Sequence, residues 1–299
     1  MQKFFDYSDE VKRAIQSKKP LLALESTIIT HGLPFPHNIE TAMAVQEIAR
    51  DHDIVPATIA IMQGKIKIGL SDADLETLVH DKYVLKASTR DIPMILSKGL
   101  NAGTTVASTL FCAHIAGIKV FATGGVGGVH RGDAEDISAD LIELTKTPIA
   151  LVSAGAKAIL DIPKTLELLE TFSIPIIGYR TDTWPQFYTA TSSHKLSTKV
   201  DNMTDLAKLL HIHWQLGLPS GILIANPVPS ENEIPAADIE PIILSALKTA
   251  EQNKITGKAI TPFLLNEVAK ATQGKSVQCN ICLIKNNVKV GAELALAIH

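Results

Sequence analysis

The chain is short of the features that mark several classes of protein. Its 299 residues include three cysteines and 5% aromatic residues, and its net charge of −3 comes without a long basic or acidic run. So few cysteines fit a reducing compartment, and we expect a cytoplasmic protein. Because a nucleic-acid duplex is bound by clustered Lys and Arg, no nucleic-acid partner is expected.

Long apolar runs and linkers are also missing. No segment has the ~18 unbroken apolar residues of a membrane helix, so no membrane partner is expected. The N-terminus, MQKFFDYSDEVKRAIQSKK, has no apolar signal core. No linker, low-complexity tract or repeat divides the sequence, and 46% of it is hydrophobic. The simplest prediction is one domain over residues 1–299 with a large core.

Short apolar runs alternate with helical faces along most of the chain. Such alternation predicts an α/β fold whose largely parallel sheet is covered on both faces. Asn38 and Ser71 are predicted helix N-caps, and Pro163 suits the first turn of a helix. The predicted strands are 21–27, 57–63, 118–123, 148–153, 174–179 and 221–226. The predicted helices are 39–52, 104–117, 138–147, 163–172, 204–217, 236–253, 262–274 and 276–298.

Two charged residues interrupt apolar runs. Lys157 sits in ALVSAGAKAIL and Glu25 in LLALESTII. Lys157 is either a side chain whose stem packs while its ammonium reaches water, or a nucleophile whose pKa is lowered by desolvation. Glu25 is either a general acid with a raised pKa or a carboxylate paired with a cation at a strand end. The local sequence leaves both alternatives open.

Polar residues follow several predicted strands, where ligands bind in open α/β sheets. The run 123-TGGVGGVHRG-132 either brings backbone N–H groups close to an anion, helped by the charge of His130 and Arg131, or forms only a turn. It matches neither the dinucleotide fingerprint nor the P-loop. Lys86 in VLKASTRD is a further cation after an apolar run.

Carboxylates cluster in the stretch DAEDISAD, at Asp133, Glu135, Asp136 and Asp140. They either cap the following helix or hold a hard divalent cation together with water. Cys279 and Cys282 form a C-x-x-C pair, but zinc normally needs four ligands and no thioredoxin-like context is present. Buried core residues are the better interpretation of these two cysteines.

Taken together in their functional alternatives, the acid, the amine, the phosphate-like loop and the candidate metal carboxylate favour an enzyme that acts on a phosphorylated sugar or carbonyl through an imine. The sequence resembles the pseudouridine-5'-phosphate glycosidase family over essentially its whole length. The motifs that carry the resemblance are ALESTIITHGLPFPHN, ATIAIMQGKIKIGL, GTTVASTL, FATGGVGGVHRG, DISADL, SAGAKAILDIPKTLELLET and GILIANPVP.

The resemblance implies a three-layer α/β/α sandwich around a mixed, largely parallel sheet, assembled as a homotrimer. It implies reversible cleavage of pseudouridine 5'-phosphate to uracil and ribose 5-phosphate, with Mn²⁺ as the metal. Carried over by motif, Glu25 is the proton donor, Lys157 the nucleophile and Asp136 the metal ligand. Substrate-binding positions fall on Lys86, Val106, Ser138, Ala139 and Asp140. Thr123 and His130 are expected at the phosphate, and Asn280 at uracil.

This chemistry explains why an amine is needed. The scissile bond joins C1' of ribose to C5 of uracil, and a carbon leaving group has no lone pair to protonate, so the usual carboxylate pair of glycosidases is a poor solution. Attack by a neutral lysine offers another path. The alternatives are a ribose-phosphate aldolase, a non-catalytic sugar-phosphate sensor and a metal-dependent phosphatase, and none of these three would release uracil.

Overall fold

A computed structural model describes residues 2–132 and 135–299. Its described residues form one eleven-stranded sheet in the order β1-β4-β3-β2-β7-β8-β11-β9-β10, and the pair β5 and β6 joins through β3. The six predicted strands are confirmed, at bounds close to those expected. They are β2 (Leu21–Leu24), β3 (Val55–Met62), β7 (Val120–Ala122), β8 (Ala150–Ser153), β9 (Ile176–Tyr179) and β11 (Ile222–Ala225).

These six strands run parallel to one another through the middle of the sheet. Their residues are almost all buried, as expected for strands covered on both faces. Shorter strands complete the sheet: β1 (Phe5–Tyr7), β4 (Lys65–Ile68), β5 (Leu85–Ala87), β6 (Ala102–Thr104) and β10 (Lys199–Val200). Since β4 and β6 pair with β3 in the antiparallel direction, the sheet is mixed.

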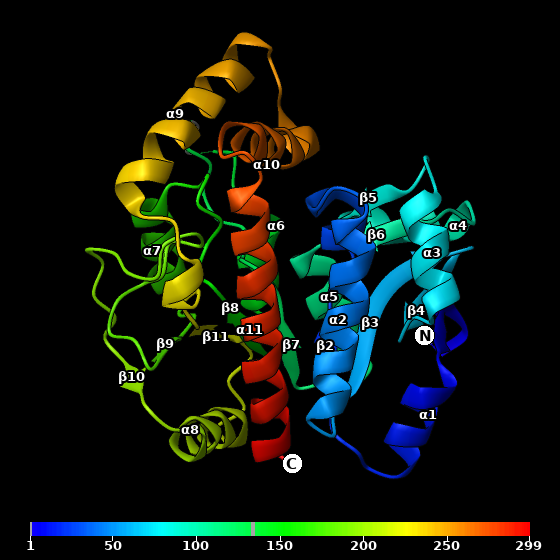
Figure 1. The fold of residues 1–299 in the computed structure, drawn as a ribbon. Coiled ribbons are helices and arrows are strands. Elements are labelled where there is room, and N and C mark those ends of the chain that lie inside the picture. The colour runs from blue at the N-terminus through cyan, green and yellow to red at the C-terminus, as the bar shows by residue number, and fades with distance from the viewer. Residues whose placement is uncertain (1, 133–134) are drawn as a thin grey trace.

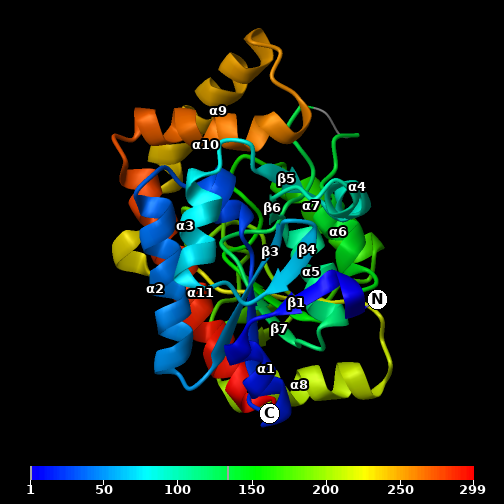
Figure 2. The same cartoon turned by 90° about the vertical axis from the view of Figure 1, so that its right-hand side faces the viewer.

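Helices flank the sheet, which confirms the predicted α/β class. On one side α2 (His37–Asp51) and α11 (Lys275–Ala297) pack together, with α3 (Asp72–His80) beside α2, and on the other lie α5 (Val106–Ile115) and α6 (Ala139–Leu144) (Figures 1 and 2). The remaining helices are α1 (Asp9–Gln16), α4 (Ile92–Ser97), α7 (Ile162–Thr171), α8 (Met203–Gln215), α9 (Ala236–Gln252) and α10 (Ile260–Ala271).

The helix starts test three predictions about individual residues. Ser71 caps α3 in a reciprocal capping box with Asp74, and Pro163 lies in the first turn of α7, so both predictions are confirmed. The Asn38 prediction is wrong, because α2 begins one residue earlier at His37. The buried Asn38 amide instead donates to the Ile29 carbonyl oxygen at 2.9 Å, tying α2 to the turn that follows β2.

The C-terminal helices approach the sheet from one end. Figure 1 shows α9 and α10 at the end of the molecule opposite α8, with α11 running down along the sheet between them. Helix α11 packs against β7 and β8. A Cβ on Gly291 would lie 3.0 Å from the Ala122 Cβ, so this glycine permits the close approach. Within the described residues, no helix combines the length and apolarity needed to cross a membrane.

Candidate active site

The candidate site lies where β2, β7 and β8 end. These three strands are neighbours in the sheet and run parallel, so their carboxyl ends share one edge. Glu25 directly follows β2, Thr123 directly follows β7, and the segment that carries Lys157 follows β8. The fold therefore brings the predicted acid and the predicted nucleophile together from positions 132 residues apart in sequence.

Glu25 is held by its neighbour on the next strand. The Thr123 hydroxyl donates a hydrogen bond to Glu25 Oε1, and Thr123 itself is buried. Burial raises the pKa of the Glu25 carboxyl, the charge of Lys157 and the Thr123 hydrogen bond act in the opposite direction, and Asp140 adds to the rise. A carboxyl with a raised pKa keeps its proton at higher pH, as a general acid requires. The sequence predicts Thr123 at the phosphate. In the structure its hydroxyl contacts Glu25 and holds the carboxyl in position.

The segment around Lys157 is fixed through its backbone. The Lys157 N–H donates to the Val126 carbonyl oxygen at 3.1 Å. The Arg131 guanidinium donates to the carbonyl oxygens of Ala158 and Leu160, each at 2.9 Å, and pairs with Glu240 on α9. Arg131 thus holds the lysine segment. The guanidinium of Arg131 is bound to these partners within the protein. This position corrects the suggestion that Arg131 draws an anion to the glycine-rich run.

Close packing requires glycine at several positions of the run 123–132. A Cβ on Gly125 would lie 2.6 Å from the Phe187 ring, and one on Gly128 would lie 2.3 Å from the Thr165 hydroxyl. Backbone N–H groups of the run are engaged within the protein: Val126 donates to Gly155, and Gly127 to Asp140. This packing supports the turn, and the anion-binding role of the run stays a prediction.

Asp140 joins two parts of the site. Its Oδ1 accepts the N–H of Ala107 in the first turn of α5, and its Oδ2 accepts the N–H of Gly127, both at 2.9 Å. The side chain is 5% exposed. A carboxylate with two backbone donors stabilises the loop and the helix start that it connects. Asp140 therefore shapes the site, and both oxygens already have partners before any substrate binds.

Two cavities meet at Glu25 and Lys157. The first, called the larger cavity, has a volume of about 550 Å³ and is lined mostly by polar and charged residues, a size suited to a small ligand. The second, called the smaller cavity, is lined by apolar residues such as Phe187, Pro262 and Leu265. The residues common to both linings are Glu25, Thr27, Lys86, Lys157 and Thr261.

The structure brings nearly all the sequence-predicted residues to these cavities. Only Thr123 lies behind the lining, at Glu25. The larger cavity is lined by Glu25, Lys86, Val106, His130, Asp136, Ser138, Ala139, Asp140 and Lys157. The smaller cavity is lined by Glu25, Lys86, Lys157 and Asn280. Asp133 lies outside the described residues, so its expected place in the carboxylate cluster stays a prediction.

Other lining residues were missed by the sequence argument. Arg90 lines the larger cavity, His31 and Phe187 the smaller one, and Thr261 both. Arg90 could have been found, because it follows Lys86 by four residues in the same strand-end segment. Phe187 and Thr261 come from distant parts of the chain and belong to no pattern at a strand end. Their places depend on the tertiary fold.

Helix α11 reaches the site with two buried asparagines. Asn287 is fully buried and donates from Nδ2 to the carbonyl oxygens of Thr123 at 2.7 Å and Gly124 at 3.2 Å. Asn226, after β11, donates to Asn287 Oδ1 at 2.9 Å. Nearer the helix start, Asn280 is 5% exposed, and its Oδ1 is buried without a hydrogen-bond partner among the described residues. An unpaired buried acceptor that lines a cavity is suited to a ligand donor.

The donor set suits only one kind of metal site. Asp136 is half-buried on the larger cavity, and within residues 2–132 and 135–299 no group of three His, Cys, Asp or Glu side chains could hold an ion. Asp140 beside it already accepts two backbone N–H groups. One carboxylate fits a hard divalent cation that keeps most of its water and takes oxygen from a bound phosphate, and it does not fit an all-protein cage.

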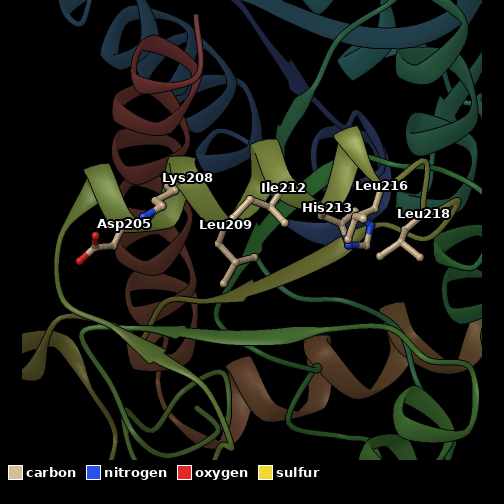
Figure 3. Close-up of a pocket in the computed structure, with 7 residues that line it drawn as sticks. All are labelled: Asp205, Lys208, Leu209, Ile212, His213, Leu216 and Leu218. Carbon is tan, nitrogen blue, oxygen red and sulfur yellow. The ribbon is translucent and has the colours of Figure 1, made fainter.

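Two further features fall outside the site. Burial raises the pKa of the Cys279 thiol to about 12, and its Sγ donates to the Tyr188 carbonyl oxygen, so Cys279 is a core residue as predicted, whereas Cys282 is only half-buried. A separate hollow of about 320 Å³ lies along α8, at the other end of the molecule from α10 (Figures 1 and 3). Its His213 is buried and bonded to the Ser220 carbonyl oxygen, and the rest of its lining is mostly apolar.

Comparison with known proteins shows the family of the chain. The family model of the indigoidine synthase A like protein matches residues 10–297. The chain belongs to this family. A relative named pseudouridine-5'-phosphate glycosidase, from Caldanaerobacter subterraneus subsp. tengcongensis, is 54% identical over all of this chain and 98% of its own length. Another of the same name, from Geobacillus kaustophilus, is 52% identical over 99% of each chain. The family resemblance seen in the motifs is thereby confirmed.

Solved structures share the fold as well. An indigoidine synthase A-like protein from Thermotoga maritima superposes with a TM-score of 0.90 at 35% identity, over 98% of this chain and 95% of its own. The prealnumycin C-glycosynthase AlnA, solved in complex with ribulose 5-phosphate, superposes with a TM-score of 0.91 at 36% identity, over 99% and 97%. These likenesses confirm the predicted α/β sandwich.

Proposed function

We propose that this protein is a pseudouridine-5'-phosphate glycosidase, which cleaves the C–C glycosidic bond of pseudouridine 5'-phosphate reversibly to uracil and ribose 5-phosphate. The observation that carries the proposal is the position of Glu25 and Lys157, which meet at the junction of a polar cavity and an apolar one. The names of the relatives from Caldanaerobacter and Geobacillus support the activity. The sugar phosphate held by AlnA supports the class of substrate.

The two cavities suit the two halves of the substrate. Lys86 and Arg90 line the larger cavity and supply positive charge for a phosphate. Val106 begins α5 there, and a helix N-terminus also favours an anion. Phe187 and Leu265 line the smaller cavity, where Asn280 adds hydrogen-bonding groups, and a flat base with polar edges suits such a lining. The scissile bond then lies between Glu25 and Lys157.

The reaction follows from these positions. The neutral amine of Lys157 attacks C1', the C1'–O4' bond breaks, and O4' takes up the proton that the attacking nitrogen loses. The lone pair of the Lys157 nitrogen then forms the C1'=N bond of an imine. The pair of the C1'–C5 bond stays on the uracil carbon, which is protonated. Water hydrolyses the imine to ribose 5-phosphate and restores the amine. Glu25 donates the proton to the uracil carbon and regains one when the imine is hydrolysed, because burial raises the pKa of its carboxyl and keeps it protonated.

Mn²⁺ is the proposed metal, with Asp136 as its carboxylate ligand among the residues that the structure describes. A divalent cation would supply charge neutralisation for the substrate phosphate there. Ser138 and Ala139, at the start of α6, would contact the sugar phosphate beside it, and His130 lines the same cavity. Asp140 keeps the start of α5 and the glycine-rich run in place around the bound group.

The imine is tested by trapping. The protein is incubated with ribose 5-phosphate, reduced with borohydride and mapped by mass spectrometry, and we expect a sugar-phosphate adduct on Lys157. Lys157→Gln should form no adduct, while Lys164→Gln, which changes an exposed lysine of α7 paired with Asp161, should form it normally. In parallel, pseudouridine 5'-phosphate with Mn²⁺ should release uracil. Release of inorganic phosphate, or an unmodified Lys157, would contradict the proposal.

A further inference from the structure

His31 lines the smaller cavity with one ring nitrogen already engaged. It lies on the helical turn Ile28–Gly32 that follows β2, and its Nδ1 is 2.7 Å from the Thr30 hydroxyl oxygen. Thr30 Oγ1 in turn donates to the Ser26 carbonyl oxygen at 3.2 Å. A Cβ at Gly103 would lie 2.2 Å from Thr30 Oγ1, so that position is kept small where the hydroxyl sits. The neighbours of His31 therefore fix its ring.

The contact with Thr30 links the position of the ring proton to the direction of the Thr30 hydroxyl hydrogen. When the single hydrogen of the Thr30 hydroxyl is donated to the Ser26 carbonyl oxygen, the hydroxyl oxygen accepts, and His31 Nδ1 is then the donor; we assign this tautomer as part of the inference. The other nitrogen, Nε2, is then an acceptor as long as the ring is neutral. Burial and the charge of Lys86 both lower the pKa of His31, which keeps the ring neutral at neutral pH. His31 thus offers the cavity an acceptor.

Asn280 adds a complementary pair on the same cavity. Its buried Oδ1 lacks a partner among the described residues, and its amide carries an acceptor and a donor side by side. Together, His31 and Asn280 offer two acceptors and one donor. In uracil joined through C5, the edge far from the sugar presents N1–H, C2=O and N3–H, which is a donor, an acceptor and a donor. In uracil joined through N1, a C5–H replaces the first of these donors.

We propose that His31 Nε2 accepts the N1–H of the base while the Asn280 amide pairs with C2=O and N3–H, so that His31 selects C-linked over N-linked uridylates. This inference rests on the proposed function, because it places the base in the smaller cavity. It assigns His31 a role in specificity. The N1–H is the one donor on that edge that the ordinary nucleotide lacks, and a buried acceptor left facing C–H would lose its hydrogen bond.

The test compares pseudouridine 5'-phosphate with its N1-methyl analogue. The unmodified protein should prefer the parent substrate by about 10- to 100-fold in kcat/KM, since one buried hydrogen bond is lost. In His31→Ala the preference should fall to within about threefold. Thr30→Val, which removes the acceptor that fixes Nδ1–H, should weaken the preference, and Thr30→Ser should restore it. His114→Ala changes an exposed histidine of α5 and should leave the preference intact.

Trapping of ribose 5-phosphate on Lys157 separates the possible failures, because that step involves no base. His31→Ala should still form the adduct. An adduct at the normal rate together with an unchanged preference for the parent substrate would overturn the role of His31 alone. Loss of the adduct in His31→Ala would also overturn it, since His31 would then act on the sugar or on folding. Loss of the adduct in the unmodified protein would overturn the proposed function, and this inference with it.

Discussion

The larger and smaller cavities share Glu25 and Lys157 but differ in how they treat polar groups. Beyond the shared residues, the larger cavity has charged side chains of its own in its lining, among them Arg90 and Asp136. The smaller cavity has mostly apolar walls, and its polar groups beyond the shared ones are few and individually placed, such as Asn280. A phosphate is recognised by charge that tolerates some displacement, whereas a neutral base is recognised by paired donors and acceptors. The reacting groups lie between the two.

Different buried side chains hold the backbone beside each of the two cavities. Asp140 connects two backbone N–H groups beside the larger cavity, and the Asn226–Asn287 pair holds the backbone at Thr123 and Gly124 near the smaller one. Both supports are buried and neither needs a ligand to complete it. The site is therefore organised before substrate binds, so that little ordering remains to oppose binding.

The largest effect is expected at the junction itself. Glu25→Gln keeps the shape and still accepts the Thr123 hydroxyl, but it has no proton to give. Uracil release should fall by roughly 10²- to 10⁴-fold, the usual contribution of a general acid. In the unmodified protein, release should decline as pH rises through the raised pKa of Glu25, because the donor is lost there. Glu47→Gln, an exposed change on α2, is the control, and near-normal turnover in Glu25→Gln would contradict the acid role.

The raised pKa also has a consequence for stability. Between the ordinary carboxyl pKa and the raised value, the folded protein binds more protons than the unfolded chain, so the contribution of Glu25 to stability falls as pH rises through this window. A glutamine side chain at this position does not titrate. The melting temperature of Glu25→Gln relative to the unmodified protein should therefore increase with pH across the window. A constant difference would mean that the carboxyl titrates as in the unfolded chain.

A smaller pair of effects should separate the two cavities. In the synthesis direction, Arg90→Ala should raise the KM for ribose 5-phosphate about 10-fold, because a hydrogen bond to a charged group is lost, and should leave the KM for uracil unchanged. Asn280→Ala should do the reverse. Initial rates measured with one substrate varied and the other saturating give all four values. If either variant moved both KM values equally, the assignment of the two halves to separate cavities would be wrong.

Parts of this arrangement were predictable from the sequence for a physical reason. Glu25 and Lys157 are charges placed in apolar runs, and the strand pattern sends both to one edge of a parallel sheet. The motif resemblance added Lys86, Val106 and the residues near Asp136. The sequence pattern gives no sign of the contacts between distant segments that hold the site in place. Asn287 lies on the last helix, 164 residues from its partner Thr123.

Misassigned residues show the same limit. Asn38 has the chemistry of an N-cap, yet its amide satisfies a carbonyl on another segment, and Arg131 has the charge of an anion site but holds the backbone around Lys157. His31 gave no periodic or motif signal of its own within ALESTIITHGLPFPHN. Its ring contacts Thr30, whose hydroxyl lies near Ser26 and Gly103, and the last of these comes from β6. Residue type limits what a side chain can do, and its tertiary partners decide among those options.

The smallest effect is expected at Thr123, which follows β7 and donates a hydrogen bond to the proposed acid, Glu25. Thr123→Val keeps the shape and removes the hydroxyl donor to Glu25. Since that hydrogen bond lowers the pKa of Glu25, its loss should raise this pKa further and move the alkaline decline of uracil release to higher pH. The turnover at the optimum should change only about three- to tenfold, because a single hydrogen bond to a group that stays in place is lost.

The matched control for this change is Thr147→Val. Thr147 is also buried and donates to a glutamate, Glu143, at 3.3 Å. Its replacement should lower the melting temperature without moving the pH profile, because Glu143 transfers no proton in the proposed reaction. An alkaline decline at the same pH in Thr123→Val and the unmodified protein would show that the Thr123 hydroxyl does not tune the acid. Thr123 would then act only in packing, and the raised pKa of Glu25 would follow from burial alone.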